Sequence, residues 1–389
     1  MVNLLLAIIY IAFISLGLPD SMLGAAWPNM HQDLNVPISY AGILSVIIAL
    51  GTIVSSLGSD YITKKLGTGK VTAFSVLITA LSLFGFYLSH NFLLLCFIAI
   101  PYGLGAGAID AALNNYVAIN YKSKHMSWLH CMWGIGSTLG PYAMGFALTN
   151  NQPWNNGYLY IFIVQIILSF VLFFTLPLWK KNNINTDSTN KSIKPITIKE
   201  IFATKGIFAV IITFFCYCAL EQTTILWASS YLVDNNSINE SLAASLGSLF
   251  VLGLTIGRFI CGFITSKLSD KSLNRLGFLL ITIGVLFMLL NINSIITFIS
   301  IIFIGFGCAP IYPCIIHSTP EYFGKEKSQS IIGIQMASAY LGVLAMPSLF
   351  GIIANHIDIK LLPYYLLILL IIMVLSHEIL IQIIKRKVN

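Results

Sequence analysis

Residues 180–204 of the chain read KKNNINTDSTNKSIKPITIKEIFAT, and this stretch separates two similar halves. It is rich in Asn, Ser, Thr and Lys and shows no regular spacing of apolar residues, which is typical of a linker. Long apolar runs lie on both sides of it, six before and six after. The stretch therefore predicts a linker between two helical bundles.

The composition is that of a chain that crosses a membrane repeatedly. Of its 389 residues, 57% are hydrophobic and 9% are charged, whereas about a quarter of the residues of a soluble domain are charged. A helix that spans a bilayer needs about 20 mainly apolar residues. We predict an all-α membrane protein with twelve spans, at residues 3–27, 38–59, 71–89, 93–119, 128–149, 157–179, 206–232, 242–265, 277–291, 295–317, 328–354 and 362–384.

The basic residues indicate the orientation of these spans. If Met1 faces the cytoplasm and the spans alternate, all but two of the 21 Lys and Arg residues lie on the cytoplasmic side, and the exceptions are Arg258 and Lys360. Basic residues favour cytoplasmic loops. We therefore predict a multi-pass cell-membrane protein with both termini in the cytoplasm. The net charge of +7 follows from this topology and does not indicate a nucleic-acid partner.

The two halves repeat a set of features about 200 residues apart. The repeated features are Gly136, Pro141 and Gly145 against Gly342, Pro347 and Gly351, and Asp20 with Trp27 against Glu221 with Trp227. Such a repeat indicates a duplicated six-helix unit. We predict an N-terminal bundle at residues 1–179, a cytoplasmic linker at 180–205 and a C-terminal bundle at 206–389.

Two six-helix halves joined by a cytoplasmic loop resemble the major facilitator superfamily, and the resemblance covers the whole chain. The loop GSDYITKKLGTGK, residues 58–70, is similar to the Gly-rich and basic signature loop of that superfamily. The resemblance implies that Lys64, Lys65 and Gly67 take part in gating. Lys64 stands where the family normally has an aspartate, so the usual charge latch is altered, and Asp60 could replace that aspartate only with a shifted geometry.

Local stretches narrow the resemblance to one branch. The stretches GLGAGAIDAALNNYV (103–117), HMSWLHCMWGIGSTLGP (125–141) and APIYPCIIHSTPEYFG (309–324) look like the fucose–proton symporter-like branch and its relatives of the bypass-of-stop-codon type. In the sugar symporters of that branch, an aspartate in the first helix and an acid in the fourth are tied to proton coupling. The resemblance places Asp20 and Asp110 at those positions.

Asp20, Asp110, Glu221 and Arg258 are the clearest charges inside predicted spans. A charge at mid-bilayer costs roughly 2.5–3.5 kcal/mol, so such a residue either has a structural partner or serves transport. Burial favours the neutral form of a carboxylic acid, which allows it to take up and release a proton as its surroundings change. We predict that Asp20, Asp110 and Glu221 couple transport to protons. Arg258 is a gating candidate, with pairing to Asp270 or to a helix C-terminus as the structural alternative.

Several polar and aromatic residues are candidates for holding a solute. Asn114 lies one helical turn after Asp110 and therefore on the same face, and its amide both donates and accepts hydrogen bonds. Aromatic rings commonly stack on sugars, although packing is the alternative for each of them. The predicted solute contacts are Asn114, Trp27, Trp133, Gln222, Trp227 and Gln335. His130 and His317 are possible proton relays or structural residues, and Trp128, Trp154 and Trp179 suit an interfacial belt.

These features predict a carrier and not an enzyme. We expect a monomer in the bilayer that moves a small, neutral, hydroxylated solute, such as a sugar, together with protons by alternating access, with no cofactor and no metal. The stretch GIGSTLGPYAMG (134–145), which includes the further gating candidates Gly136 and Pro141, partly matches a span-five signature of proton-coupled efflux antiporters. Efflux of drugs or metabolites is therefore the alternative. A nutrient receptor built on the same fold is a further one.

Overall fold

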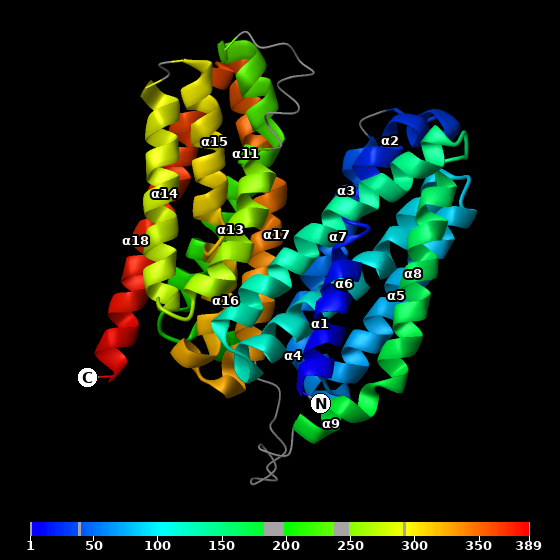
Figure 1. Ribbon diagram of the computed structural model, residues 1–389, viewed down its shortest axis with the longest axis horizontal. Coiled ribbons are helices and arrows are strands. Elements are labelled where there is room, and N and C mark those ends of the chain that lie inside the picture. Colours follow the sequence, from blue (N-terminus) through cyan, green and yellow to red (C-terminus); the bar gives the residue numbers. More distant parts are fainter. Residues whose placement is uncertain (1, 38–39, 183–197, 237–248, 291–292, 389) are drawn as a thin grey trace. The chain divides into compact units, whose positions relative to one another are not determined.

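The computed structural model describes residues 2–37, 40–182, 198–236, 249–290 and 293–388, and every regular element in these ranges is a helix (Figure 1). The first half contains α1 (Val2–Gly17), α2 (Met22–Asp33), α3 (Ala41–Leu57), α4 (Ser59–Leu66), α5 (Thr68–Leu88), α6 (Phe92–Asn120), α7 (Ser123–Thr149), α8 (Asn155–Phe174) and α9 (Leu176–Asn182). The predicted linker falls largely on residues 183–197, outside the described ranges. The second half contains α10 (Ile198–Phe202), α11 (Ile207–Asn236), α13 (Leu249–Ile264), α14 (Asp270–Leu290), α15 (Ser294–Cys308), α16 (Ile311–Phe323), α17 (Lys325–His356), η3 (Ile359–Leu361) and α18 (Leu362–Val388).

These helices account for the predicted spans. Among the described residues, 9 helices are long and apolar enough to cross a membrane, and the bent pair α3–α4 raises the number to 10. Two further helices lie on the fifth and eighth predicted runs. The first is α7, which begins with the polar sequence SKHMSWLH, and the second is α13, which has 16 residues and follows the undescribed segment 237–248. Each of the twelve predicted runs thus contains a described helix or a broken helix pair, which confirms the fold class.

Helix α8 shows that the surroundings of the bundle are apolar. Its inner face buries Tyr158, Ile161 and Leu168, together with the amide of Gln165. Its outer face exposes large apolar side chains at helical spacing, and these are Ile163, Val164, Ile167, Phe170, Val171 and Phe174. A long exposed apolar stripe of this kind is unfavourable in water and is satisfied in lipid.

The chain groups into two compact units. Unit 1 comprises Met1–Tyr116 and Leu129–Ile196, and unit 2 comprises Val117–Trp128 and Thr197–Asn389. The segment Val117–Trp128, called the junction segment below, includes the end of α6 and the start of α7. It belongs to unit 2, although the rest of α6 and α7 belongs to unit 1.

Equivalent close glycine contacts occur within unit 1 and within unit 2. A Cβ placed on Gly136 of α7 would lie 2.0 Å from the Ile14 carbonyl oxygen of α1, and one on Gly342 of α17 would lie 2.7 Å from the Phe215 oxygen of α11. The same holds for Gly103 of α6 against Ile48 of α3, at 2.2 Å, and for Gly305 of α15 against Phe250 of α13, at 2.3 Å. Small residues let membrane helices approach closely. Each contact thus recurs about 200 residues later, as expected for a duplicated bundle.

Pro19 interrupts the first span and thereby positions Asp20. Proline has no backbone N–H and disfavours helical geometry at the preceding residue. The regular α-helical hydrogen bonds end here. They are replaced by a tighter turn, in which the Asp20 N–H donates to the Gly17 oxygen three residues earlier, at 3.2 Å. Asp20 therefore lies in a break between α1 and α2, and its side chain is exposed on unit 1.

Candidate functional site

Asp110 forms the centre of a buried polar network in unit 1. Its side chain is 6% exposed on α6, and Asn114 is 0% exposed one turn later. The Asn114 Nδ2 donates to Asp110 Oδ1 at 2.7 Å and to the Asp110 backbone oxygen at 3.0 Å. Since the two residues lie on one helix, the helical spacing itself brings the amide and the carboxylate together.

His130 of α7 extends this network to a second helix. The His130 Nε2 lies 3.1 Å from Asn114 Oδ1. Because Asn114 directs its N–H groups toward Asp110, its oxygen must accept, so the His130 Nε2 carries the hydrogen and donates. The result is a chain of donors that runs from His130 through Asn114 to the Asp110 carboxylate. Both polar atoms of Asn114 are occupied in this arrangement.

Asp20 belongs to the same part of unit 1. Its Oδ2 accepts a hydrogen bond from Trp133 Nε1 at 2.7 Å, and Trp133 lies on α7 one turn after His130. Asp20 is also near enough to Asp110 for their charges to interact. Four residues predicted from the sequence, Asp20, Asp110, Asn114 and Trp133, thus gather in one site.

A second cluster lies in unit 2 around Glu221 of α11. The Tyr217 hydroxyl, one turn earlier, donates to Glu221 Oε2. The Arg258 guanidinium of α13 lies 3.6 Å from that carboxylate and donates to the Tyr217 hydroxyl at 3.4 Å. Arg258 is 3% exposed, and a buried cation needs such a partner. The structural alternative from the sequence, a pair between Arg258 and Asp270, is not the one found, because Asp270 bonds His317 instead.

The remaining predicted solute contacts are not bonded to these two clusters by any interaction that the structure describes, although Gln222 directly follows Glu221 on α11. Gln335 is 0% exposed, and its Oε1 accepts from Thr319 at 3.2 Å. The Trp227 Nε1 donates to the Pro347 oxygen at 3.0 Å, and the Trp227 ring packs on Phe350. Trp27 is 5% exposed in the apolar core of unit 1, whereas Gln222 is half-buried on α11. The structure brings none of these four into contact with Asp20, Asp110 or Glu221 through the interactions it describes.

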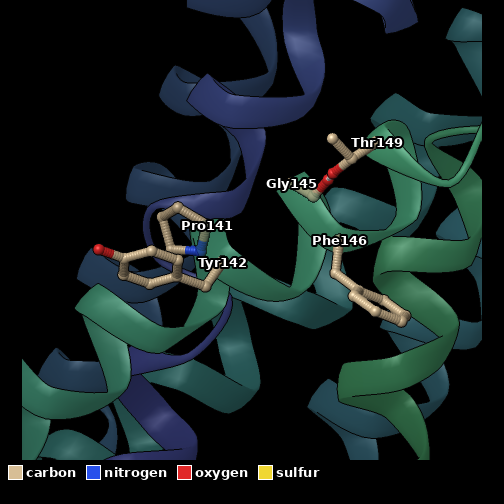
Figure 2. A pocket seen from close by; sticks show the side chains of 5 residues that line it. All are labelled: Pro141, Tyr142, Gly145, Phe146 and Thr149. Carbon is tan, nitrogen blue, oxygen red and sulfur yellow. Dashed lines mark hydrogen bonds between the residues drawn. The ribbon is translucent and has the colours of Figure 1, made fainter.

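The predicted gating residues occupy the turn between α4 and α5 and the middle of α7. Lys64 pairs with Asp60 at 2.9 Å within α4, and the Lys65 ammonium lies 5.8 Å from the centre of the Tyr61 ring. Gly67 has φ = +81°, a conformation that favours glycine, and it separates the two helices. Pro141 lines an open hollow of about 550 Å³ on α7, next to Tyr142 and Phe146 (Figure 2).

The sequence pointed to the acids better than to their partners. Tyr217 was missed, although its position four residues before Glu221 places both on one helix face. His130 was predicted as a proton relay or a structural residue, but its contact with Asn114 was not, because that contact depends on how α6 and α7 pack. No spacing in the sequence gives that packing.

Comparison with known proteins identifies the family. The profile of the Major Facilitator Superfamily matches residues 9–235 and 210–384. The chain belongs to the Major Facilitator Superfamily. The profile thus matches each half of the chain separately, in agreement with the duplicated bundle.

Relatives and solved structures agree with this membership. Bypass of stop codon protein 6 of Saccharomyces cerevisiae is 24% identical over 91% of this chain and 77% of its own length. The glucose/mannose transporter GlcP of Bacillus subtilis is 21% identical over 88% of this chain and 86% of its own length. The crystal structure of the E. coli fucose:proton symporter FucP superposes with a TM-score of 0.77 at 13% identity, over 96% of this chain and 98% of that one. The superposition shows the twelve-helix fold of the superfamily. Membership of the superfamily makes this chain a membrane transporter.

Proposed function

We propose that this transporter carries a small, neutral, hydroxylated solute, such as a sugar, in symport with protons. The observation that carries the proposal is that the acids Asp20 and Asp110 lie near each other in unit 1, each accepting a side-chain hydrogen bond. The similarity to a protein named as a glucose/mannose transporter and to a structure titled as a fucose:proton symporter supports it.

The chemistry proposed for the two acids is proton binding. Two nearby carboxylates repel each other when both are charged, and this repulsion is relieved when one of them takes up a proton. Asp20 is exposed and Asp110 is buried. We propose that a proton enters at Asp20, and that Asp110, held by the Asn114 amide, is the site that carries it through the transport cycle. Glu221 is the third candidate for binding a coupling proton. Its ion pair with Arg258 gives it a structural role as well.

The proposed solute contacts follow from the same geometry. Trp133 is half-buried and already directs its indole N–H at Asp20, so a sugar ring stacked on it would lie next to a proton site. Asn114 would reach a solute hydroxyl only by exchanging its bond to Asp110 or His130. Binding of the solute at Asn114 would then change the surroundings of the proton site, which is the link that symport requires.

We also propose the topology and organisation predicted from the sequence. The transporter would be a monomer in the cell membrane, with an N-terminal bundle at 1–179, a linker at 180–205, a C-terminal bundle at 206–389 and both termini in the cytoplasm. The one-sided distribution of Lys and Arg supports this orientation. An epitope tag at either terminus that antibody reaches on intact cells would contradict it.

Purified protein in liposomes tests the proposed activity. Labelled neutral sugars are offered with an imposed pH gradient, inside alkaline, and uptake is followed over time. Each pH unit supplies about 1.4 kcal/mol, which corresponds to a tenfold accumulation at one proton per solute. Accumulation of a sugar that scales with the gradient supports symport. Drug resistance in pump-deficient cells without accumulation of any tested sugar would favour the efflux alternative.

A further inference from the structure

A third polar cluster lies in unit 2 and shares no residue with the two acid clusters. His317 of α16 has contacts on both ring nitrogens: Nδ1 lies 2.5 Å from Asp270 Oδ2 at the start of α14, and Nε2 lies 3.1 Å from the Tyr121 backbone oxygen. The Ser123 hydroxyl donates to the other oxygen of Asp270. Tyr121 and Ser123 both belong to the junction segment.

The two partners of His317 are both acceptors. A neutral imidazole carries one N–H, so one of its two nitrogens would then present a lone pair to an oxygen lone pair. Only the doubly protonated ring donates to a carboxylate and to a carbonyl at once, and the short contact with Asp270 is that of a charge-assisted hydrogen bond. Because an ionised carboxylate only accepts, these contacts with an ionised Asp270 call for a cationic His317.

We propose that His317 is a proton-binding site and that the bound proton fastens the junction segment to the rest of unit 2. Its ligand is a single proton, held as the second N–H of the ring between Asp270 and the Tyr121 carbonyl. When the proton leaves, one of the two bonds is lost and the junction segment is held less firmly. The proposal does not depend on sugar transport or on the roles of Asp20 and Asp110.

The charged and titratable groups around the cluster are consistent with a bound cation. Asp270 of α14 and Glu321 of α16 interact electrostatically with His317. Cys314 and Tyr322, also on α16, lie near the Asp270 carboxylate. The junction segment contributes uncharged groups to the contacts, the Tyr121 carbonyl and the Ser123 hydroxyl. Its lysines, Lys122 and Lys124, lie near His125.

A second attachment of the junction segment does not involve a proton. Trp128 packs on α13 so closely that a Cβ on Gly262 would lie 1.9 Å from its Nε1, and its ring meets Phe263 edge-on at 5.5 Å. The apolar contact holds one end of the segment at any pH, while the contact at His317 holds the other end by both of its bonds only in the protonated state. The segment continues into α6 and α7, which carry Asp110 and Trp133. Its attachment therefore affects the helices that bear the candidate site.

The test measures the ring protonation and the attachment separately in the full chain in lipid nanodiscs. Nitrogen NMR of histidine-labelled protein should show both nitrogens of His317 protonated at pH 6, with the signal assigned by its loss in His317→Gln. Hydrogen exchange of residues 117–128, corrected for the chemical rate, should lose protection roughly tenfold as the pH rises from 6 to 9, the effect of one charge-assisted bond.

His377 provides a matched control in the same unit. Its Nε2 lies 3.3 Å from the amide nitrogen of Asn274, a donor, so that this nitrogen accepts and no second proton is needed. His377→Gln should keep the pH dependence of the wild-type protein, and His317→Gln should abolish it. If His317→Gln does not fold, Asp270→Asn removes the negative charge that the protonated His317 faces and carries the same expectation. A neutral His317 at pH 6, or equal pH dependence in the wild type and in the variant that folds, would overturn the proposal.

Discussion

Replacing Gly136 by alanine should destabilise unit 1 by separating α1 from α7. The added Cβ would lie 2.0 Å from the Ile14 oxygen and 3.0 Å from the Leu18 nitrogen. Both are backbone atoms, so no side-chain rotation relieves the clash. A carbon atom needs at least 3.0 Å from such an atom, and α1 must therefore move away by about 1 Å at this point, a shift that disturbs its close packing.

The size of the effect follows from two opposing terms. Forcing an extra methyl into a packed interior costs about 1–3 kcal/mol, while alanine gains up to about 1 kcal/mol over glycine in a helix. Gly145 lies on the same helix with nothing within 4 Å of an added Cβ, so Gly145→Ala has only the favourable term. At roughly 2–4 °C per kcal/mol for a unit of this size, Gly136→Ala should unfold several degrees below Gly145→Ala.

Thermal unfolding of the two variants in the same detergent, followed by intrinsic fluorescence, measures this difference. Uptake should fall together with stability in Gly136→Ala. The reason is that separating α1 from α7 also disturbs the bond between Trp133 of α7 and Asp20. The reasoning about the close contact between α1 and α7 would be refuted if both variants unfolded at the same temperature.

Three further predictions concern the polar contacts. Arg258→Gln should cost up to about 3 kcal/mol in unfolding measurements because the half-buried Glu221 carboxylate loses its cation. Adding Glu221→Gln should recover part of this loss, and full stability of the single variant would argue against the ion pair. Arg275→Gln should cost at most about 1 kcal/mol in the same measurement, because Arg275 and its partner Glu378 are 51% and 32% exposed, and a loss as large as that of Arg258→Gln would contradict this. Trp133→Phe keeps an aromatic ring but removes the N–H that donates to Asp20. Proton-driven uptake should therefore fall roughly tenfold while the unfolding temperature stays the same, and unaltered uptake would exclude a role for this bond.

The spans were predictable because lipid imposes a simple rule on the sequence. A helix that crosses a bilayer must remain apolar for about 20 residues, and α5, α6 and α8 follow the predicted runs within a few residues. The duplicated glycines were visible as well, because close helix contacts tolerate no side chain at Gly136 or Gly342.

The partners of the embedded charges were not predictable in the same way. Which residues meet across two helices depends on the rotation and tilt of each helix. Neither can be read from the hydropathy of the sequence. Arg258 could as well have met Asp270 as Glu221, and only the packing of α11 against α13 decides between them. Trp128 illustrates the same limit: its position near a span end suggests the membrane interface, and that position does not reveal that it packs on Gly262. Asp20 and Asp110 were identified because charge is rare in spans, but their network needed the structure.

The central claim is that Asp110 carries the coupling proton, and Asp110→Asn tests it most directly. Asparagine keeps the size of the side chain and avoids the cost of a charge in lipid, but it cannot bind and release a proton. Liposomes containing the wild-type protein should accumulate solute in proportion to an imposed pH gradient. Liposomes containing the variant should show no accumulation while they still exchange labelled for unlabelled solute. Accumulation by the variant with the pH dependence of the wild type would contradict the claim and transfer the role to Asp20 or Glu221.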